Sequence, residues 1–215
     1  MPLIVVIPSR YLGVNRICVV TSKAKAYYSI VSRMRKAGLP FTSMEKADDC
    51  KDCELIVTSA AEAKKFRGRV LSLEDLSESP GVFKGQLLSK LDGGRDVVLI
   101  GIDPGTRTGL AVFYGETNLE YSTSDSVSQL NLRVGNFVRG VPAKRFVIRV
   151  GNGSPSAAIK IVESLKSAAP DASIEMVNES GTSVRRVRVR GLQGDQGAAA
   201  KIAFRKGEVV GLKDI

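Results

Sequence analysis

Three acidic residues stand where the sequence predicts the ends of buried elements. Asp103 closes the apolar run 97–102, Glu179 follows the predicted strand 173–178, and Asp195 begins an alanine-rich helix. A carboxylate at the end of a buried strand is unfavourable unless it is paired or bound to a cation, and converging carboxylates repel one another. A divalent cation removes both penalties. We therefore predict that Asp103, Glu179 and Asp195 are catalytic residues and metal ligands.

The composition favours a hard cation at this site. The chain of 215 residues contains no histidine, which excludes Ser-His-Asp and Cys-His catalysis and histidine-ligated zinc. Carboxylate oxygens are the ligands that Mg²⁺ and Mn²⁺ prefer. The expected cofactor is Mg²⁺, with Mn²⁺ as the alternative.

The charge of the chain indicates a polyanionic partner. Lys and Arg number 32 against 22 Asp and Glu, a net charge of +10, and the excess is +6 in residues 1–90 and +4 in residues 91–215. Such a balance suits nucleic acid, branched or duplex DNA or RNA, although it is also typical of a solubilising surface. Arginine contacts phosphate through two donors, so we predict nucleic-acid contacts at Arg107, which lies just after Asp103, and at Arg185, Arg186, Arg188 and Arg190. The alternative for the run of four arginines is an edge strand kept soluble by its charge.

The second half predicts a mixed five-stranded sheet. The hydrophobic pattern gives the order βββ-α-β-α-β-α, which is the order of the ribonuclease H-like fold. The expected strands are 96–103, 109–114, 119–123, 145–150 and 173–178, and the expected helices are 126–138, one that begins at Ser154 and Pro155, and 194–205.

The first half predicts a small α/β domain with a mostly parallel sheet, because its strands and helices alternate. The expected strands are 16–20, 41–44, 54–58 and 69–73, and the expected helices follow Ser22 and span 60–66. The breaker-rich segment 76–94 is interpreted as a linker with a short helix at 86–91. We therefore expect two domains, 1–90 with its linker and 91–215, and the residues of the first do not disclose its role.

The cysteines and the apolar runs bear on the compartment. Cys18, Cys50 and Cys53 are too few for a disulfide framework, which favours a reducing cytoplasm. The spacing Cys50-x-x-Cys53 indicates either chance or a local disulfide. No apolar run is long enough to span a bilayer, so we expect a cytoplasmic protein with no membrane partner.

Several motifs of the second half resemble those of RuvC-type and YqgF-type Holliday junction resolvases. The strand and turn Ile100–Val112 is similar to their first motif, Val177–Ser183 to their strand-end motif, Asp195–Ala203 to their alanine-rich last helix and Val150–Ser154 to their glycine-rich turn. The resemblance covers about residues 96–206. It implies that Asp103, Glu179 and Asp195 hold the catalytic metal, and that the protein works as a homodimer.

The leading hypothesis is a metal-dependent endonuclease, similar to a Holliday junction resolvase, that acts on structured nucleic acid. The first alternative is a nucleic-acid-binding protein that keeps the ribonuclease H-like fold without cleavage. The second is a nucleotide-binding protein of the actin or sugar-kinase type, whose first strand and turn are similar. That type requires two such domains and a second phosphate-binding motif, for which the remaining chain is too short.

Overall fold

The computed structural model describes residues 17–45, 53–179 and 194–210. It divides into two compact units, one formed mainly by the chain up to Arg95 and the other mainly by the chain from Asp96 onward. Within the described residues, no helix combines the length and the apolar character that a membrane crossing requires. The protein is therefore a mixed α/β chain with two separate sheets, and each unit is described by itself.

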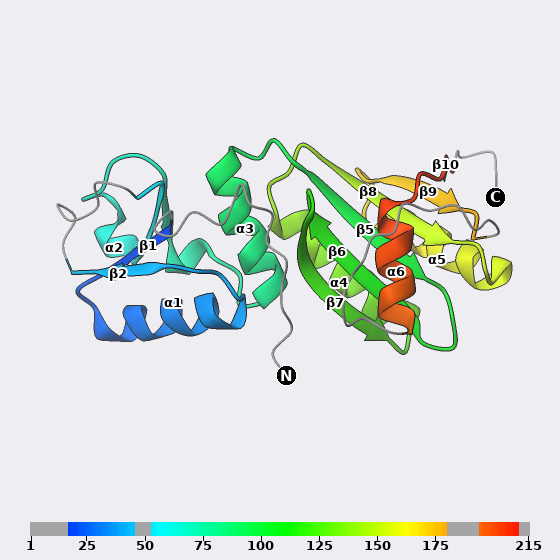
Figure 1. Ribbon diagram of the computed structural model, residues 1–215, viewed down its shortest axis with the longest axis horizontal. Helices are drawn as coiled ribbons and strands as arrows, with labels where there is room; N and C mark the ends of the chain where they lie inside the picture. Colours follow the sequence, from blue (N-terminus) through cyan, green and yellow to red (C-terminus); the bar gives the residue numbers. More distant parts are fainter. Residues whose placement is uncertain (1–16, 46–52, 180–193, 211–215) are drawn as a thin grey trace. The chain divides into compact units, whose positions relative to one another are not determined.

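The first unit is built on a four-stranded parallel sheet in the order β2-β1-β3-β4 (Figure 1). The two central strands, β1 and β3, are buried along their whole length, as expected for apolar strands with helices on their faces. The elements are β1 (Ile17–Val20), α1 (Ala24–Lys36), β2 (Thr42–Met44), β3 (Leu55–Thr58), α2 (Ala60–Ala63), β4 (Val70–Ser72), a 3-10 helix (Leu73–Asp75) and α3 (Pro80–Asp92). The predicted alternation of strands and helices is confirmed.

Most of the segment 76–94 is the 13-residue helix α3, which contains the expected short helix at 86–91 but begins well before it, so the rest of the segment is not the linker that was expected. Most of the breaker residues lie at its ends, and Gly85 lies inside the helix. Pro80 occupies the first turn, where its missing N–H has no partner to lose, and Gly93 ends the helix in the left-handed conformation with φ 78°. The helix is buried around most of its circumference, which obscures the amphipathic pattern that would have predicted it.

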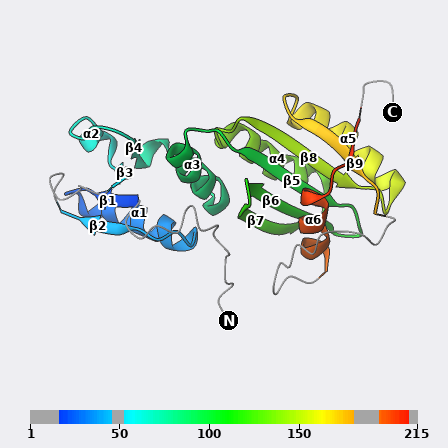
Figure 2. The same ribbon diagram turned by 45° about the horizontal axis from the view of Figure 1, so that its top comes forward.

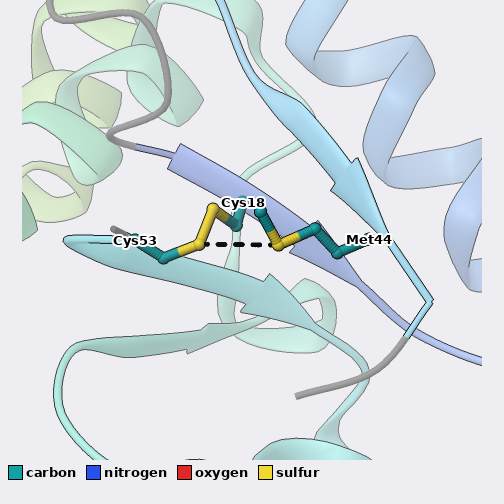
Figure 3. The surroundings of a disulfide bond; sticks show 3 residues. All are labelled: Cys18, Met44 and Cys53. Atoms are coloured by element: carbon teal, nitrogen blue, oxygen red, sulfur yellow. Dashed lines mark hydrogen bonds between the residues drawn. A yellow bond between two sulfur atoms is a disulfide. The ribbon is translucent and has the colours of Figure 1, made fainter. Parts of the chain in front are cut away.

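The first unit also contains a disulfide between Cys18 and Cys53 (Figure 3). The alternative of a local disulfide between Cys50 and Cys53 is therefore wrong. Cys18 lies in β1, Cys53 lies just before the neighbouring strand β3, and their Cα atoms are 5.9 Å apart. The sulfur of Met44 is 3.8 Å from that of Cys53. The pairing depends on the order of the strands in the sheet, and the spacing of the cysteines in the sequence contains no trace of it.

The second unit is built on a six-stranded mixed sheet in the order β10-β9-β8-β5-β6-β7. The strands β5, β6 and β7 form an antiparallel meander, and β8 and β9 follow in parallel to β5. The sixth strand, β10, pairs with β9 and is absent from the five-stranded prediction. The elements are β5 (Val97–Asp103), β6 (Thr108–Tyr114), β7 (Thr117–Ser124), α4 (Val127–Gly140), β8 (Arg145–Gly151), α5 (Pro155–Ala168), β9 (Ser173–Val177), α6 (Asp195–Phe204) and β10 (Glu208–Val209).

The helix α6 lies on one face of this sheet, and α4 and α5 lie on the other (Figures 1 and 2). Alternation along a strand assigns its residues to the two faces. Ala111 and Phe113 of β6 pack against α6, together with Leu99 of β5. Two residues further along β5, a Cβ on Gly101 would clash with the main-chain oxygen of Ala199 in α6. Asp103, the next residue in this alternation, is therefore on the α6 face.

Candidate metal centre

Asp103 is the last residue of β5 and is partly buried. The strand before it is apolar because it is central in the sheet, with β6 on one side and β8 on the other. In the antiparallel ladder Asp103 is the partner of Gly109 in β6. Its carboxylate therefore lies at the end of a central strand, on the face of the sheet that α6 covers.

Asp195 is the first residue of α6, and its backbone lies against Gly109, the residue that pairs with Asp103. A Cβ added to Gly109 would lie 2.6 Å from the carbonyl carbon of Asp195 and 3.1 Å from its Cβ. The backbone of α6 therefore touches the sheet at Gly109, as it does at Gly101. Only glycine leaves room for this approach, and the approach brings Asp195 beside the end of β5.

Glu179 comes two residues after β9 and lies over the end of β8. Its Oε1 accepts a 2.8 Å hydrogen bond from the backbone N–H of Gly153, and its own N–H donates a 3.0 Å hydrogen bond to Oδ1 of Asn152. A Cβ on Gly151 would clash with the same Oε1. Gly151 ends β8, the strand adjacent to β5, so Glu179 reaches the site from the side opposite Asp195.

The electrostatics of Asp103 reflect this convergence. Burial raises the pKa of its carboxyl group, and the negative charges of Glu179 and Asp195 raise that pKa further. Like charges close to a half-buried carboxylate disfavour its ionised form. The structure thus brings together the three acids that the sequence singled out. Their use as metal ligands and catalytic groups stays a prediction.

The donor set fits a hard divalent cation, since all three groups offer carboxylate oxygens. Within residues 17–45, 53–179 and 194–210, no group of three or more His, Cys, Asp or Glu side chains is arranged so that it could hold a metal ion. One oxygen of Glu179 is already hydrogen-bonded to Gly153. Ligation by all three acids would thus require their side chains to turn about single bonds, which Asp and Glu do readily.

Of the predicted phosphate-binding arginines, only Arg107 lies among the described residues. Its Nε is 3.2 Å from Oδ1 of Asp125, and its Nη2 donates a 2.8 Å hydrogen bond to Thr123. Thr123 is the register partner of Gly109, which places Arg107 near the same end of the sheet. The side chain is 61% exposed and stays accessible to a phosphate group. Arg185, Arg186, Arg188 and Arg190 lie outside the described residues.

Sequence reasoning missed the groups that fix the far end of α6. Arg149 of β8 forms a 2.8 Å ion pair with Glu175 of β9, and both side chains are mostly buried. Arg149 also donates a 2.7 Å hydrogen bond to the main-chain oxygen of Ala203, at the end of α6. The signal for this pair was a charged residue in the interior of each of two adjacent strands. The pair anchors the helix that carries Asp195.

A family comparison places a match in the first unit. A family model for a response regulator receiver-like domain matches residues 16–79, which include all four strands of the parallel sheet. No curated protein matches the chain. The resemblance to RuvC-type and YqgF-type resolvases is contradicted by this result, because the family found is a receiver-like domain. The motifs behind that resemblance are short strand-and-turn patterns that unrelated proteins share, as the similarity to sugar kinases already indicated.

The first unit contains a polar cluster of its own, at the carboxyl end of its parallel sheet. The buried carboxylate of Glu62 accepts hydrogen bonds from Thr21, from the backbone and side chain of Ser22, and from Ser59. These bonds, that of Thr21 first, lower the pKa of Glu62 from 4.5 to about 2. The carboxylate is saturated with donors from two loops, so its evident role is to join the loop after β1 to the loop after β3.

We expect Glu62→Gln to reduce the free energy of unfolding by about 1–3 kcal/mol at neutral pH, because donors lose a charged acceptor. A lowered pKa in the fold gives stability that is present above pH 4.5 and is lost as the pH falls through about 2. The difference between the two proteins should therefore shrink toward pH 2. Urea unfolding at several pH values measures it, with Glu78→Gln at a 92% exposed side chain as the control. A difference that is the same at pH 7 and pH 2.5 would contradict this account.

The raised pKa of Asp103 predicts the opposite sign for that residue. In the metal-free protein, the fold favours the protonated acid while the unfolded chain ionises near pH 3.8. Asp103 therefore gives stability below pH 3.8 that is lost as the pH rises through its raised pKa. We expect Asp103→Asn to be more stable than the wild type at pH 7 when EDTA is present, and this gain should vanish at low pH. Asp171→Asn, in an exposed turn, is the control and should change nothing.

Proposed function

We propose that the second unit has a ribonuclease H-like arrangement and is a metal-dependent nuclease that acts on structured nucleic acid. The proposal is supported by an antiparallel meander followed by two parallel strands. It is further supported by acids at the carboxyl end of the central strand, just after β9 and at the first residue of α6. The net charge of +10 suits a polyanionic substrate.

The observation that carries the proposal is the effect of Glu179 and Asp195 on Asp103. Burial raises the pKa of Asp103 most, and the charges of Glu179 and Asp195 raise it further, so the fold places both acids near Asp103. Carboxyl groups whose pKa is raised by burial and by neighbouring carboxylates are frequent at functional sites. Asp103 is central, since its strand lies between the strands that support the other two acids.

In the proposed site each residue has a distinct task. Asp103 would hold the cation in its ionised form, which ligation requires. Glu179 is oriented by Gly153 and Asn152, which leaves its second carboxylate oxygen for ligation. Asp195 is fixed by the contact of α6 with Gly109. When bound, Mg²⁺ or Mn²⁺ would supply an activated water and stabilise the charge that develops on the scissile phosphate. Arg107, exposed at the same end of the sheet, would contact a neighbouring phosphate.

The test is a cleavage assay with the purified chain on four-way junctions, flaps, duplexes and single strands, each as DNA and as RNA. Strand scission that requires Mg²⁺ or Mn²⁺ and stops with EDTA is the expected result. Absence of scission on every substrate, with binding intact, would reject the nuclease and support the second candidate function.

That second candidate is nucleic-acid binding without cleavage. The observation that favours it is the hydrogen bond between Glu179 and Gly153, which occupies one oxygen of a proposed ligand. Calorimetric titration with Mn²⁺ separates the two candidates before any nuclease assay. Binding that is lost in Asp103→Asn supports the nuclease, and heat that does not depend on Asp103 supports the binding protein.

A further inference from the structure

The helix α1 of the first unit presents an outward face that is basic and contains no acid. Its 13 residues include Lys25, Arg33, Arg35 and Lys36 and no Asp or Glu. Its inner face buries Ala26, Ile30, Val31 and Met34 against the sheet. The opposite face, at positions three, four and seven apart, consists of Lys25, Tyr28, Ser29, Ser32, Arg35 and Lys36. We call these six residues the α1 face.

The charges of the α1 face are not neutralised within the described part of the chain. Arg33, beside this face, is held by the main-chain oxygen of Leu76 and by Glu78. Lys25, Arg35 and Lys36 are exposed and form no ion pair with a described residue. A helix face that serves solubility alone usually mixes charges of both signs. This face carries one sign only.

Two further features are unfavourable for the isolated helix. Lys23 is the residue that caps α1 and Lys25 lies in its first turn, where the helix dipole disfavours positive charge, and no acid compensates. Tyr28 is 78% exposed, the most exposed large hydrophobic side chain among the described residues. Its neighbour Tyr27 is engaged with Ser43 through its hydroxyl group. Arg35 and Lys36 lie in the last turn, where the helix dipole favours positive charge, so it is Lys25 and Tyr28 that the stability of α1 does not explain.

We propose that the α1 face binds the phosphate backbone of nucleic acid, with Tyr28 at the centre of the contact. Lys and Arg neutralise phosphates, and Ser and Tyr hydroxyl groups donate hydrogen bonds to phosphate oxygens. Figure 1 shows α1 alongside the parallel sheet of the first unit, and the inner face of the helix is buried. The inference rests on nucleic acid as the partner in the proposed function, and it gives the first unit a role that catalysis does not require.

The test compares two triple variants with the same loss of charge. The first is K25Q/R35Q/K36Q on the α1 face, and the matched control is K64Q/K65Q/R67Q, at exposed positions after α2 in the same unit. Binding to a fluorescent 30-base-pair duplex is measured by anisotropy between 50 and 200 mM salt. Each lost phosphate contact should flatten the slope of log K against log salt by about 0.9. A slope of 0.9 means that one phosphate contact changes the binding constant about eightfold for each tenfold change in salt concentration.

The expected result is a loss of at least about tenfold at 0.1 M salt and a flatter slope in the α1 variant, with smaller changes in the control. The charge-preserving variant K25R/R35K/K36R should keep wild-type binding, which excludes a general loss of structure. Because the chain has no tryptophan, Tyr28→Trp places one reporter on the face. Its fluorescence should change when the duplex binds.

Three outcomes overturn the proposal. Equal losses in both triple variants would mean that net charge alone drives binding. Unchanged binding in the α1 variant, while the wild type binds, would reject the α1 face and leave the proposed function intact. If the wild type binds no nucleic acid, the partner in the proposed function fails as well.

Hydrolysis of the small diester bis(p-nitrophenyl) phosphate should be the same in the α1 variant and the wild type.

Discussion

Asp103→Asn should abolish metal-dependent cleavage while nucleic-acid binding stays at wild-type strength or becomes tighter. The substitution removes the proposed ligand that lies between Glu179 and Asp195, and metal stabilisation of a phosphoryl transition state is worth several kcal/mol. Since 1.36 kcal/mol corresponds to a tenfold change, we expect the rate to fall by about a thousandfold or more. Binding should not suffer, because a negative charge near the substrate phosphates is lost.

The measurement pairs single-turnover cleavage with an affinity titration in Ca²⁺ for each protein. Asp171→Asn, an identical change at an exposed turn, should cleave at the wild-type rate. Glu179→Gln and Asp195→Asn should each lower the rate. Combinations with Asp103→Asn should add little, because the three groups would act together in the proposed site. Cleavage by Asp103→Asn at the wild-type rate would remove the site from the mechanism.

The sequence predicts most elements of the second unit because their signals are local. The apolar run before Asp103 is a central strand, and Ser154 with Pro155 begins α5. The last helix was expected at 194–205 and spans Asp195–Phe204. The short strand β10 was not predicted. Its two exposed residues have no apolar pattern, and they belong to the sheet only through pairing with β9.

The convergence of the acids could be predicted because adjacent parallel strands end at one edge of a sheet. The contacts that set their positions could not. Gly101 and Gly109 are ordinary glycines in the sequence, and only the packed structure shows that the backbone of α6 lies against both. The hydrogen bond from Gly153 to Glu179 joins residues 26 positions apart. The resemblance to RuvC-type and YqgF-type resolvases was wrong for a related reason. Short motifs describe a turn and an acidic residue, and they contain no information on the packing around them.

The first unit shows where local signals are insufficient. Its sheet order β2-β1-β3-β4 brings β1 and β3 together although 34 residues separate the end of β1 from the start of β3. The Cys18–Cys53 disulfide follows from that neighbourhood. Cys18 is fully buried, among Val20, Ile56 and other apolar side chains of the same cluster. A count of three cysteines gives no indication of this bond.

Reduction of this disulfide should lower the free energy of unfolding of the first unit by about 4 kcal/mol. A cross-link between residues 35 positions apart restricts the unfolded chain, and the loop-entropy relation gives that value for a loop of this length. A bond between Cys50 and Cys53 would close a loop of only four residues and would contribute about 2 kcal/mol. Urea unfolding with and without reductant measures this loss of free energy. It should be about 4 kcal/mol in the wild type and in Cys50→Ala, and reductant should have no effect on Cys53→Ala. If Cys50→Ala and not Cys18→Ala removes the response to reductant, the pairing in the structure is wrong.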